Sequence, residues 1–433
     1  VLVDGIVFLL LTVTGLRKII FDAIPQAVKV AISAGIGLFI AFIGMQNVHL
    51  VIGNSSTLVS LASFNLRSES VTWAAIFPLL LTVITVFAIG AMAKKKVKGA
   101  VLWGILGSAV LYYVIGLLTV PGFFADKVQP NLTSDFFAAF KDFGTQAVGK
   151  VFTEGFDFSA YIAANGSGNF IIMFLTSMLA FCMVDMFDTL GTLYGACACG
   201  NMLTKEGNVP NMNKAMLADA IATCCGAACG TSTVTTFVES SAGVAEGGRT
   251  GLASMATAAL FFIAMFLAPV AKLIPTYACS AALIYVGVLM MSNVRSINWD
   301  DPADAVVGFL TVAIMPLTYN ISYGIAFGLI SYVFIKIFTG KIKEVNVGTW
   351  VITILFALMF FLTHFLGKCP VQWTGHFFIV YPSTCLVIST ALCRGRCLHR
   401  PTFLNPFFSF SARKKRTVSI FQEKKEGRCI PLS

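Results

Sequence analysis

The chain has 433 residues, of which 57% are hydrophobic and only 12% charged. Soluble domains carry about 25% charged residues, so this composition excludes an ordinary soluble protein and predicts a polytopic helical membrane protein. The net charge of +10 comes from basic residues in short loops and in the C-terminal tail, which indicates membrane orientation rather than nucleic-acid binding. No common nucleotide-binding, metalloprotease or serine-hydrolase motif occurs in the sequence. We therefore expect no nucleic-acid partner and no enzymatic activity.

The chain opens within an apolar run, Val1 to Gly15, which is too short to cross a bilayer by itself. Arg17 and Lys18 follow this run, and we interpret them as the cytoplasmic flank of a helix whose start is missing. Further apolar spans are expected at 28–47, 72–93, 99–120, 169–197, 213–229, 251–275, 279–293, 302–318, 320–338 and 347–366. Basic clusters between the spans up to residue 338 all fall on one face, which the positive-inside rule makes cytoplasmic.

Small residues recur along the span 28–47, at Ala31, Ala34, Gly35, Gly37, Ala41 and Gly44. Such residues let two helix backbones approach closely in a membrane. We therefore predict that this span crosses a neighbouring helix at short distance.

Two connections differ from the spans in composition. Residues 121–168 are expected on the outer face, with short amphipathic helices. Near Gly367 the composition changes abruptly, and 368–433 is rich in Cys and basic residues. A frame error or a mis-joined exon explains this change better than a natural basic tail.

Acidic residues mark the span 169–197. Asp185 and Asp188 are three residues apart and Thr192 follows four residues later, so all three share one helix face. A charge at mid-bilayer depth costs about 2.5–3.5 kcal/mol on insertion scales, and such residues usually face a cavity and have a function. The alternative is that they are structural and paired with Lys or Arg on another helix. Because few basic residues occur within the spans, we favour function.

The stretch Gly230–Gly243 cannot be a plain spanning helix. Its β-branched run from Thr231 to Val238 favours extended backbone, and Ser240 or Ser241 is a good helix N-cap. Non-helical backbone is tolerated at membrane depth only inside protein or along a cavity. We therefore predict an interrupted segment with Glu239 at its break, of the kind that carriers use as a binding site. A re-entrant packing loop is the alternative.

A site built from these groups offers carboxylates, hydroxyls and backbone N–H groups but few cations. It suits a neutral ligand with N–H donors, and a buried acid that can hold a proton also provides a coupling group. The cysteines in the nearby sequence, Cys197, Cys199, Cys224, Cys225 and Cys229, are interpreted as small apolar residues, and we expect no metal site.

Three motifs, Ala31–Gly44, Met186–Leu193 and Gly230–Gly251, closely resemble the AzgA-like branch of the nucleobase:cation symporter-2 family. These are adenine, guanine and hypoxanthine permeases related to the xanthine and uracil permeases. The resemblance runs from residue 1 to about 366 and does not include 368–433.

The resemblance implies an all-α polytopic membrane protein with a uracil-permease-like fold of two inverted repeats of seven segments. A core domain carries the substrate, a gate domain moves against it, and a short strand interrupts segment 10; this chain would lack segments 1–3. The implied division is 1–20, part of core segment 4; 21–120, gate segments 5–7; 121–168, extracellular loop; 169–275, core segments 8–11; 276–345, gate segments 12–14; 346–367, an additional apolar helix; and 368–433, the basic tail.

The function that the resemblance implies is proton-coupled uptake of purine bases across the plasma membrane by alternating access. Glu239 would accept hydrogen bonds from purine N–H groups, while Asp185 and Asp188 would share ligand contact and proton coupling, in roles that stay open. Thr192, Thr236 and Phe237 would complete the site, Phe237 by stacking on the base. The proton is the coupling ion and no cofactor is implied; a homodimer stays open. The alternatives are a sulfate or bicarbonate carrier of the same fold and a truncated chain without activity.

Overall fold

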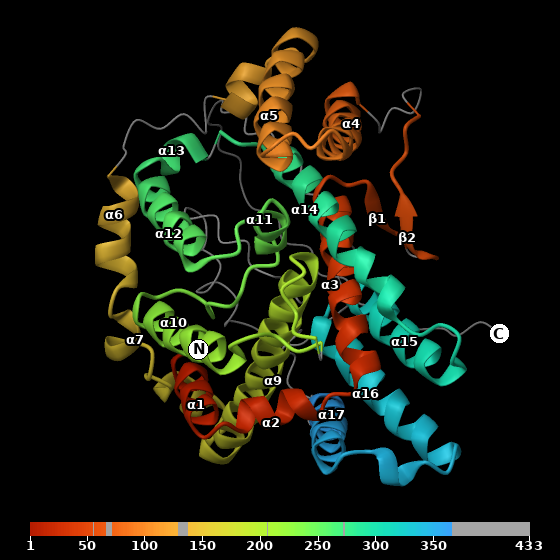
Figure 1. Ribbon diagram of the computed structural model, residues 1–433. Helices are drawn as coiled ribbons and strands as arrows, with labels where there is room; N and C mark the ends of the chain where they lie inside the picture. The colour runs from red at the N-terminus through yellow and green to blue at the C-terminus, as the bar shows by residue number, and fades with distance from the viewer. Residues whose placement is uncertain (55, 66–71, 129–136, 206, 272, 366–433) are drawn as a thin grey trace, which may run out of the picture. The chain divides into compact units, whose positions relative to one another are not determined.

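The computed structural model describes residues 1–54, 56–65, 72–128, 137–205, 207–271 and 273–365 (Figure 1). The predicted tail, 368–433, and the last two residues of the predicted helix 346–367 lie outside these ranges. The long helices are α3 Gln26–Asn47, α4 Trp73–Lys94, α5 Ala100–Thr119, α9 Ser167–Cys199, α10 Met212–Ala228, α12 Gly251–Phe266, α14 Thr276–Met291, α15 Pro302–Thr318, α16 Ile321–Phe338 and α17 Val347–Phe365. Shorter helices are α1 Leu2–Val13, α2 Leu16–Ala23, α6 Ala138–Asp142, α7 Lys150–Thr153, α8 Ser159–Asn165, α11 Ser240–Ala245 and α13 Ala268–Ala271.

The helices match the predicted spans closely, and the protein is an all-α polytopic membrane protein. Six of the described helices, α3, α4, α5, α9, α14 (with the turn after it) and α16, are long and apolar enough to cross a membrane. The span predicted at 251–275 is divided, because α12 ends at Phe266 and α13 begins at Ala268. Pro269 explains the division, since proline has no N–H to continue the hydrogen-bond ladder of α12.

Local signals in the sequence set several helix ends. Asp301 caps α15 by accepting a hydrogen bond from the Ala303 N–H at 3.0 Å, and Pro302 occupies the first helical position. Asn320 caps α16 in the same way through the Tyr323 N–H at 3.3 Å. Because α15 and α16 are separated only by this short capped turn, they pack against each other.

One element was absent from our predictions, the β-hairpin formed by β1 Val51–Asn54 and β2 Leu58–Leu61. The Asn54 side chain closes its turn by accepting hydrogen bonds from the Ser56 N–H at 2.8 Å and the Thr57 N–H at 3.3 Å. An Asn followed by Ser and Thr between β-branched residues is a turn signal, and it could have identified the hairpin.

The predicted close crossing of the small-residue helix is confirmed. Helix α3 packs against α14, and Figure 1 shows the two side by side. A Cβ atom at Gly37 would lie only 2.8 Å from both the Gly287 carbonyl oxygen and the Met290 Cβ atom. A Cβ atom at Gly44 would lie 3.0 Å from the Ser280 carbonyl oxygen. The two backbones are therefore in direct contact, which only residues without a side chain permit.

Replacing Gly37 by Val is expected to separate α3 from α14 and to lower the thermal stability of the detergent-solubilised protein. Overpacking of this kind costs about 1–3 kcal/mol. The measurement is the midpoint of thermal unfolding followed by size-exclusion chromatography. Gly107→Val in α5 is the matched control, because a Cβ atom at Gly107 would meet nothing within 4 Å. Equal midpoints for the two variants would contradict the close crossing.

Two helices lie at the centre of the packing. Helix α3 contacts α14, α15 and α16, and α14 contacts α4 and α5, while α9 contacts α1, α11, α3 and α16. The division into gate and core, and the movement of one relative to the other, stay predictions. Helix α17 packs against α2, α9 and α16, and its Thr349 hydroxyl donates to the Ala23 carbonyl of α2.

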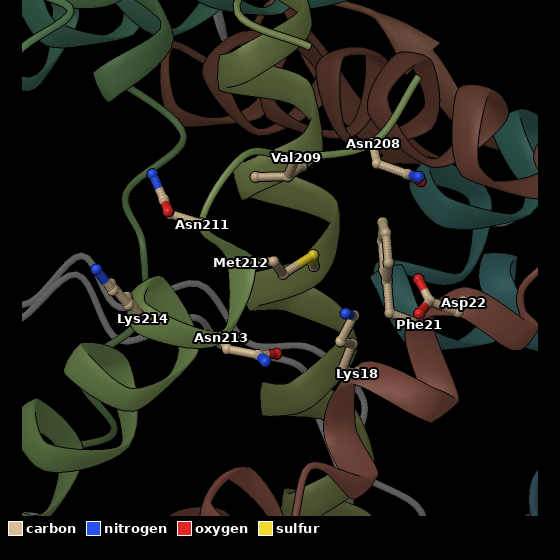
Figure 2. Close-up of a pocket in the computed structure, with 9 residues that line it drawn as sticks. All are labelled: Lys18, Phe21, Asp22, Asn208, Val209, Asn211, Met212, Asn213 and Lys214. Carbon is tan, nitrogen blue, oxygen red and sulfur yellow. The ribbon is translucent and has the colours of Figure 1, made fainter. Parts of the chain in front are cut away.

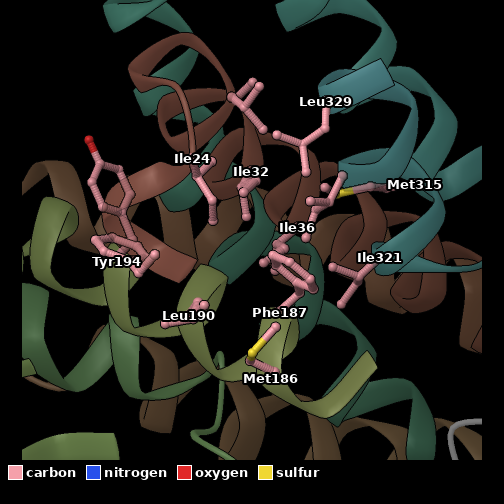
Figure 3. Packing of buried hydrophobic residues seen from close by; sticks show 14 of the residues in the cluster. Ile24, Ile32, Ile36, Met186, Phe187, Leu190, Tyr194, Met315, Ile321 and Leu329 are labelled. Carbon is pink, nitrogen blue, oxygen red and sulfur yellow. The ribbon is translucent and has the colours of Figure 1, made fainter. Parts of the chain in front are cut away.

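The apolar core fixes the orientation of α9. Its residues Met186, Phe187, Leu190 and Tyr194 are buried against α3, α16 and α17 (Figure 3). The facing residues include Ile32, Ile36, Met315, Ile321, Leu329 and Phe356. Since this side of α9 is committed to the core, its opposite side is available for polar groups.

Candidate functional site

Helix α9 is divided into an apolar face and a polar face. At about 100° per residue, Asp185, Asp188, Thr189 and Thr192 lie within one arc of about 100°, and the core residues lie on the other side. All four polar residues are buried: Asp188 is 8% exposed, Asp185 4%, Thr192 1% and Thr189 not at all. The predicted polar stripe therefore exists, and it contains Thr189 in addition to the residues we named.

The two acids of this stripe lack protein partners. Neither side-chain oxygen of Asp185 has a hydrogen-bond partner within the described residues, and the same holds for Oδ1 of Asp188. A buried carboxylate without partners is unfavourable. Both side chains can therefore accept hydrogen bonds from a ligand or bind a proton.

The threonines of the stripe differ in what they contact. The Thr192 hydroxyl donates to the backbone carbonyl of Asp188 at 2.9 Å, so its single donor is used within the helix. The Thr189 hydroxyl donates to Oδ2 of Asp219 on α10 at 3.1 Å. Thr192 can contribute only as an acceptor, while Thr189 connects α9 to α10.

Arg17 corrects one interpretation made from the sequence. We had interpreted it as part of the cytoplasmic flank of a helix, but its side chain is fully buried and forms an ion pair with Asp219 (Nη2 to Oδ2, 3.3 Å). Its guanidinium also lies 4.5 Å from the centre of the Phe8 ring. The short helix α2 turns back after Gly15, whose φ of 74° allows the bend, and this places Arg17 inside. Asp219, as an unmatched acid in an apolar helix, was the signal that a buried cation was required.

The predicted interruption after α10 is present. Helix α10 ends in a Schellman motif, with the Gly230 N–H donating to Ala227 and the Thr231 N–H to Gly226. Residues 231–237 have no regular secondary structure, and α11 begins only at Ser240. The backbone here is irregular rather than a strand, because no described segment pairs with it. The Thr223 hydroxyl holds this segment by donating to the Val234 carbonyl at 3.0 Å.

The predicted ligand contacts of the interrupted segment lie on its accessible side. Glu239 occupies the N-cap position of α11, which we had assigned to Ser240 or Ser241, and its side chain is exposed. Phe237 is 62% exposed, with its ring stacked at 6.4 Å from that of Phe261, and Thr236 is half-buried. The Phe237 ring and the Glu239 side chain are therefore both accessible.

Electrostatics connect the segment to α9. The negative charges of the Asp219 and Glu239 carboxylates both repel a negative charge on Asp188. A negative charge on Asp185 is repelled by the carboxylates of Asp219, Asp4 and Asp188 and is attracted by the guanidinium of Arg17. Asp219 thus acts on both acids of the stripe, whereas, of these two, Glu239 acts only on Asp188, and Asp4 and Arg17 act only on Asp185. Asp4 on α1, which the sequence analysis missed, is also buried, and neither of its oxygens has a hydrogen-bond partner among the described residues.

A surface cavity of about 510 Å³ lies elsewhere, between α2 and the N-terminal end of α10 (Figure 2). It is lined by Lys18, Phe21, Asp22, Asn208, Val209, Asn211, Met212, Asn213 and Lys214. None of the predicted site residues lines it. The cavity is therefore separate from the polar face of α9 and from the interrupted segment.

The chain is similar to known permeases. The sequence model described as Permease family, of the xanthine and uracil permease type, matches residues 1–327. A permease of Methanocaldococcus jannaschii is 39% identical over 361 residues, which cover 83% of this chain and 74% of that protein. The guanine/hypoxanthine permease PbuG of Bacillus subtilis is 37% identical over 361 residues (83% and 74%). The adenine permease AdeP of Escherichia coli is 34% identical over 350 residues (81% and 70%).

Proposed function

Because this chain belongs to the Permease family of the xanthine and uracil permease type, we propose that it takes up purine bases together with a proton by alternating access. It is a multi-pass protein of the plasma membrane and a transporter rather than an enzyme. Relatives that are named adenine or guanine/hypoxanthine permeases support the choice of hypoxanthine, guanine and adenine as substrates.

The observation that carries the proposal is the meeting of two unpartnered acids on α9 with an interrupted segment that presents Glu239. Purine bases carry N–H donors and a flat aromatic face. Carboxylates accept strong charge-assisted hydrogen bonds from such donors, and an aromatic ring can stack on the base. Glu239 and Asp188 would bind the N–H groups, Phe237 would stack, and Thr236 and Thr192 would provide further oxygen acceptors.

The proton is assigned to Asp185. Asp188 feels the charge of Glu239 in the interrupted segment, and Asp185 feels the charge of Arg17, so the surroundings of the two acids suit different tasks. Asp185 is one of four buried carboxyl groups, together with Asp4, Asp188 and Asp219. A proton on Asp185 removes one buried negative charge, which lowers the free-energy cost of moving the core domain. The assignment supplies the coupling role that the sequence left open between the two acids.

A sulfate or bicarbonate carrier fits the site less well. Such a site would need a cation facing the ligand, whereas the side chains of Glu239, Asp188 and Asp185 are all acidic. The cation that acts on Asp185, Arg17, is already bound to Asp219. Repulsion between like charges would therefore oppose anion binding here.

Uptake of radiolabelled hypoxanthine into cells that lack their own purine permeases tests the proposal. We expect saturable uptake that unlabelled guanine and adenine inhibit and that collapse of the proton gradient abolishes. Replacing sodium by choline should change nothing. Uptake of labelled sulfate or bicarbonate without hypoxanthine uptake would favour the anion carrier, and a correctly inserted protein without any uptake would favour the inactive fragment.

A further inference from the structure

Arg17 is the only side-chain cation that acts on the buried acids in the described part of the chain. We call Asp4, Asp185, Asp188 and Asp219 the acid cluster. Three of its members, all except Asp188, feel the charge of Arg17. Lys29, on the neighbouring helix α3, lies instead 4.2 Å above the Phe21 ring. The single positive charge of Arg17 therefore interacts with three carboxyl groups, and it cannot neutralise all of them.

The bonds of Arg17 leave it room to change partner. Its Nη2 lies 3.3 Å from Oδ2 of Asp219, and its Nη1 lies 3.3 Å from the Met216 carbonyl and 3.4 Å from the Thr12 hydroxyl. Charge-assisted hydrogen bonds are usually about 2.7–2.9 Å long. Its Nε is buried without a hydrogen-bond partner in the described residues. The hydrogen bonds of the guanidinium are thus long, and it retains an unused donor.

The groups around Asp185 come from four elements. They are Asp4 on α1, Arg17 on α2, Asp188 and Cys182 on α9 itself, and Asp219 on α10. In addition, Glu239 acts on Asp188 from the segment before α11, and the α-amino group of Val1 acts on Asp4. Every nearby charge other than Arg17 that acts directly on Asp185 is negative or able to become negative. An ionised Asp185 therefore depends on Arg17.

We propose that Arg17 is a movable counter-charge, which pairs with Asp219 while Asp185 carries a proton and shifts towards Asp185 when that proton leaves. The proposal rests on the proposed proton coupling and names the residue that makes it reversible. Thr189 supports the change of partner, because its hydroxyl already donates to Oδ2 of Asp219 and continues to stabilise that carboxylate when Arg17 moves. Arg17 is in this view a positioning residue that does not touch the substrate.

The consequence is mechanical. Arg17 belongs to α2, which connects α1 with α3, and its two partners belong to α10 and α9. When the guanidinium moves from Asp219 to Asp185, α2 becomes bound to α9 instead of α10. Loss or gain of the Asp185 proton is in this way transmitted to the segment that leads into α3.

Infrared titration of the purified protein tests the proposal without any substrate. The carbonyl stretch of protonated carboxyl groups is followed against pH, and the Asp185 contribution is identified as the part that Asp185→Asn removes. In Arg17→Gln we expect the Asp185 band to persist to a pH about 1–3 units higher, since its counter-charge is gone. In Asp219→Asn we expect a shift to lower pH, because the negative charge of Asp219 is gone and Arg17 is then free to pair with Asp185.

Opposite shifts in the two variants support the proposal. An unchanged midpoint in Arg17→Gln, or shifts in the same direction, would overturn it. Lys18→Gln is the matched control, because it removes one positive charge from an exposed position of the same helix, and it should leave the midpoint unchanged. If Arg17→Gln does not yield folded protein, the guanidinium stretch of Arg17 decides in the unsubstituted protein: a band that shifts together with the Asp185 titration supports the proposal, and a band that stays constant across it overturns the proposal.

The outcome is separate from that of the transport assay. Opposite infrared shifts in a protein that takes up no purine would overturn the proposed function and leave the role of Arg17 intact. Normal purine uptake together with unshifted infrared titrations would support the proposed function and overturn the proposed role of Arg17.

Discussion

Replacing Glu239 by Gln is expected to abolish hypoxanthine uptake while the protein still reaches the cell surface. A hydrogen bond to a charged group contributes about 1.5–3 kcal/mol, so loss of the carboxylate should reduce uptake at low substrate concentration by about 10- to 100-fold for each purine N–H group. The Gln side chain has nearly the same shape, and Glu239 is exposed at a helix N-cap, so little change in stability is expected.

The measurement is the initial rate of radiolabelled hypoxanthine uptake divided by the amount of protein at the surface. Glu246→Gln is the matched control, since Glu246 is an exposed glutamate at the other end of the same helix, α11. It should transport normally. Uptake by Glu239→Gln at the rate of this control would remove Glu239 from the binding site.

Asp185→Asn and Asp188→Asn are expected to fail in different ways. Asp185→Asn should bind purine and exchange external for internal label, but it should no longer accumulate purine against a gradient. A pH difference of one unit is worth about 1.4 kcal/mol, or about tenfold accumulation for one proton per purine, and this factor should fall to one. Asp188→Asn should lose both exchange and accumulation, because Asp188 is the acid that feels the charge of Glu239 in the interrupted segment.

Counterflow in proteoliposomes, with and without an imposed pH gradient, separates these outcomes. Thr176 is half-buried nearer the other end of α9, and its hydroxyl bonds only to its own helix, so Thr176→Ala provides a control. If Asp185→Asn still responds to the pH gradient, the proton belongs to another group. If Asp188→Asn keeps full exchange, the ligand contact assigned to it is wrong.

The spans, the polar stripe and the break at Glu239 could all be predicted from the sequence, because each depends on local pattern. Apolar runs near 20 residues long must be helical in a bilayer, acids three residues apart share a helix face, and a Thr-rich run after Gly230 cannot continue a helix. The hairpin at Val51–Leu61 and the division at Pro269 have equally local signals.

Which acids are paired could be decided only by the tertiary structure. The sequence placed Arg17 in a flank and Asp219 in a span about 200 residues away, and the ion pair between them forms only when α2 folds back onto α10. The difference between Asp185 and Asp188 has the same origin, since it depends on which helix packs beside each. Periodicity determines which face of a helix a side chain occupies, but the partner across that face is set by long-range packing that no local pattern contains.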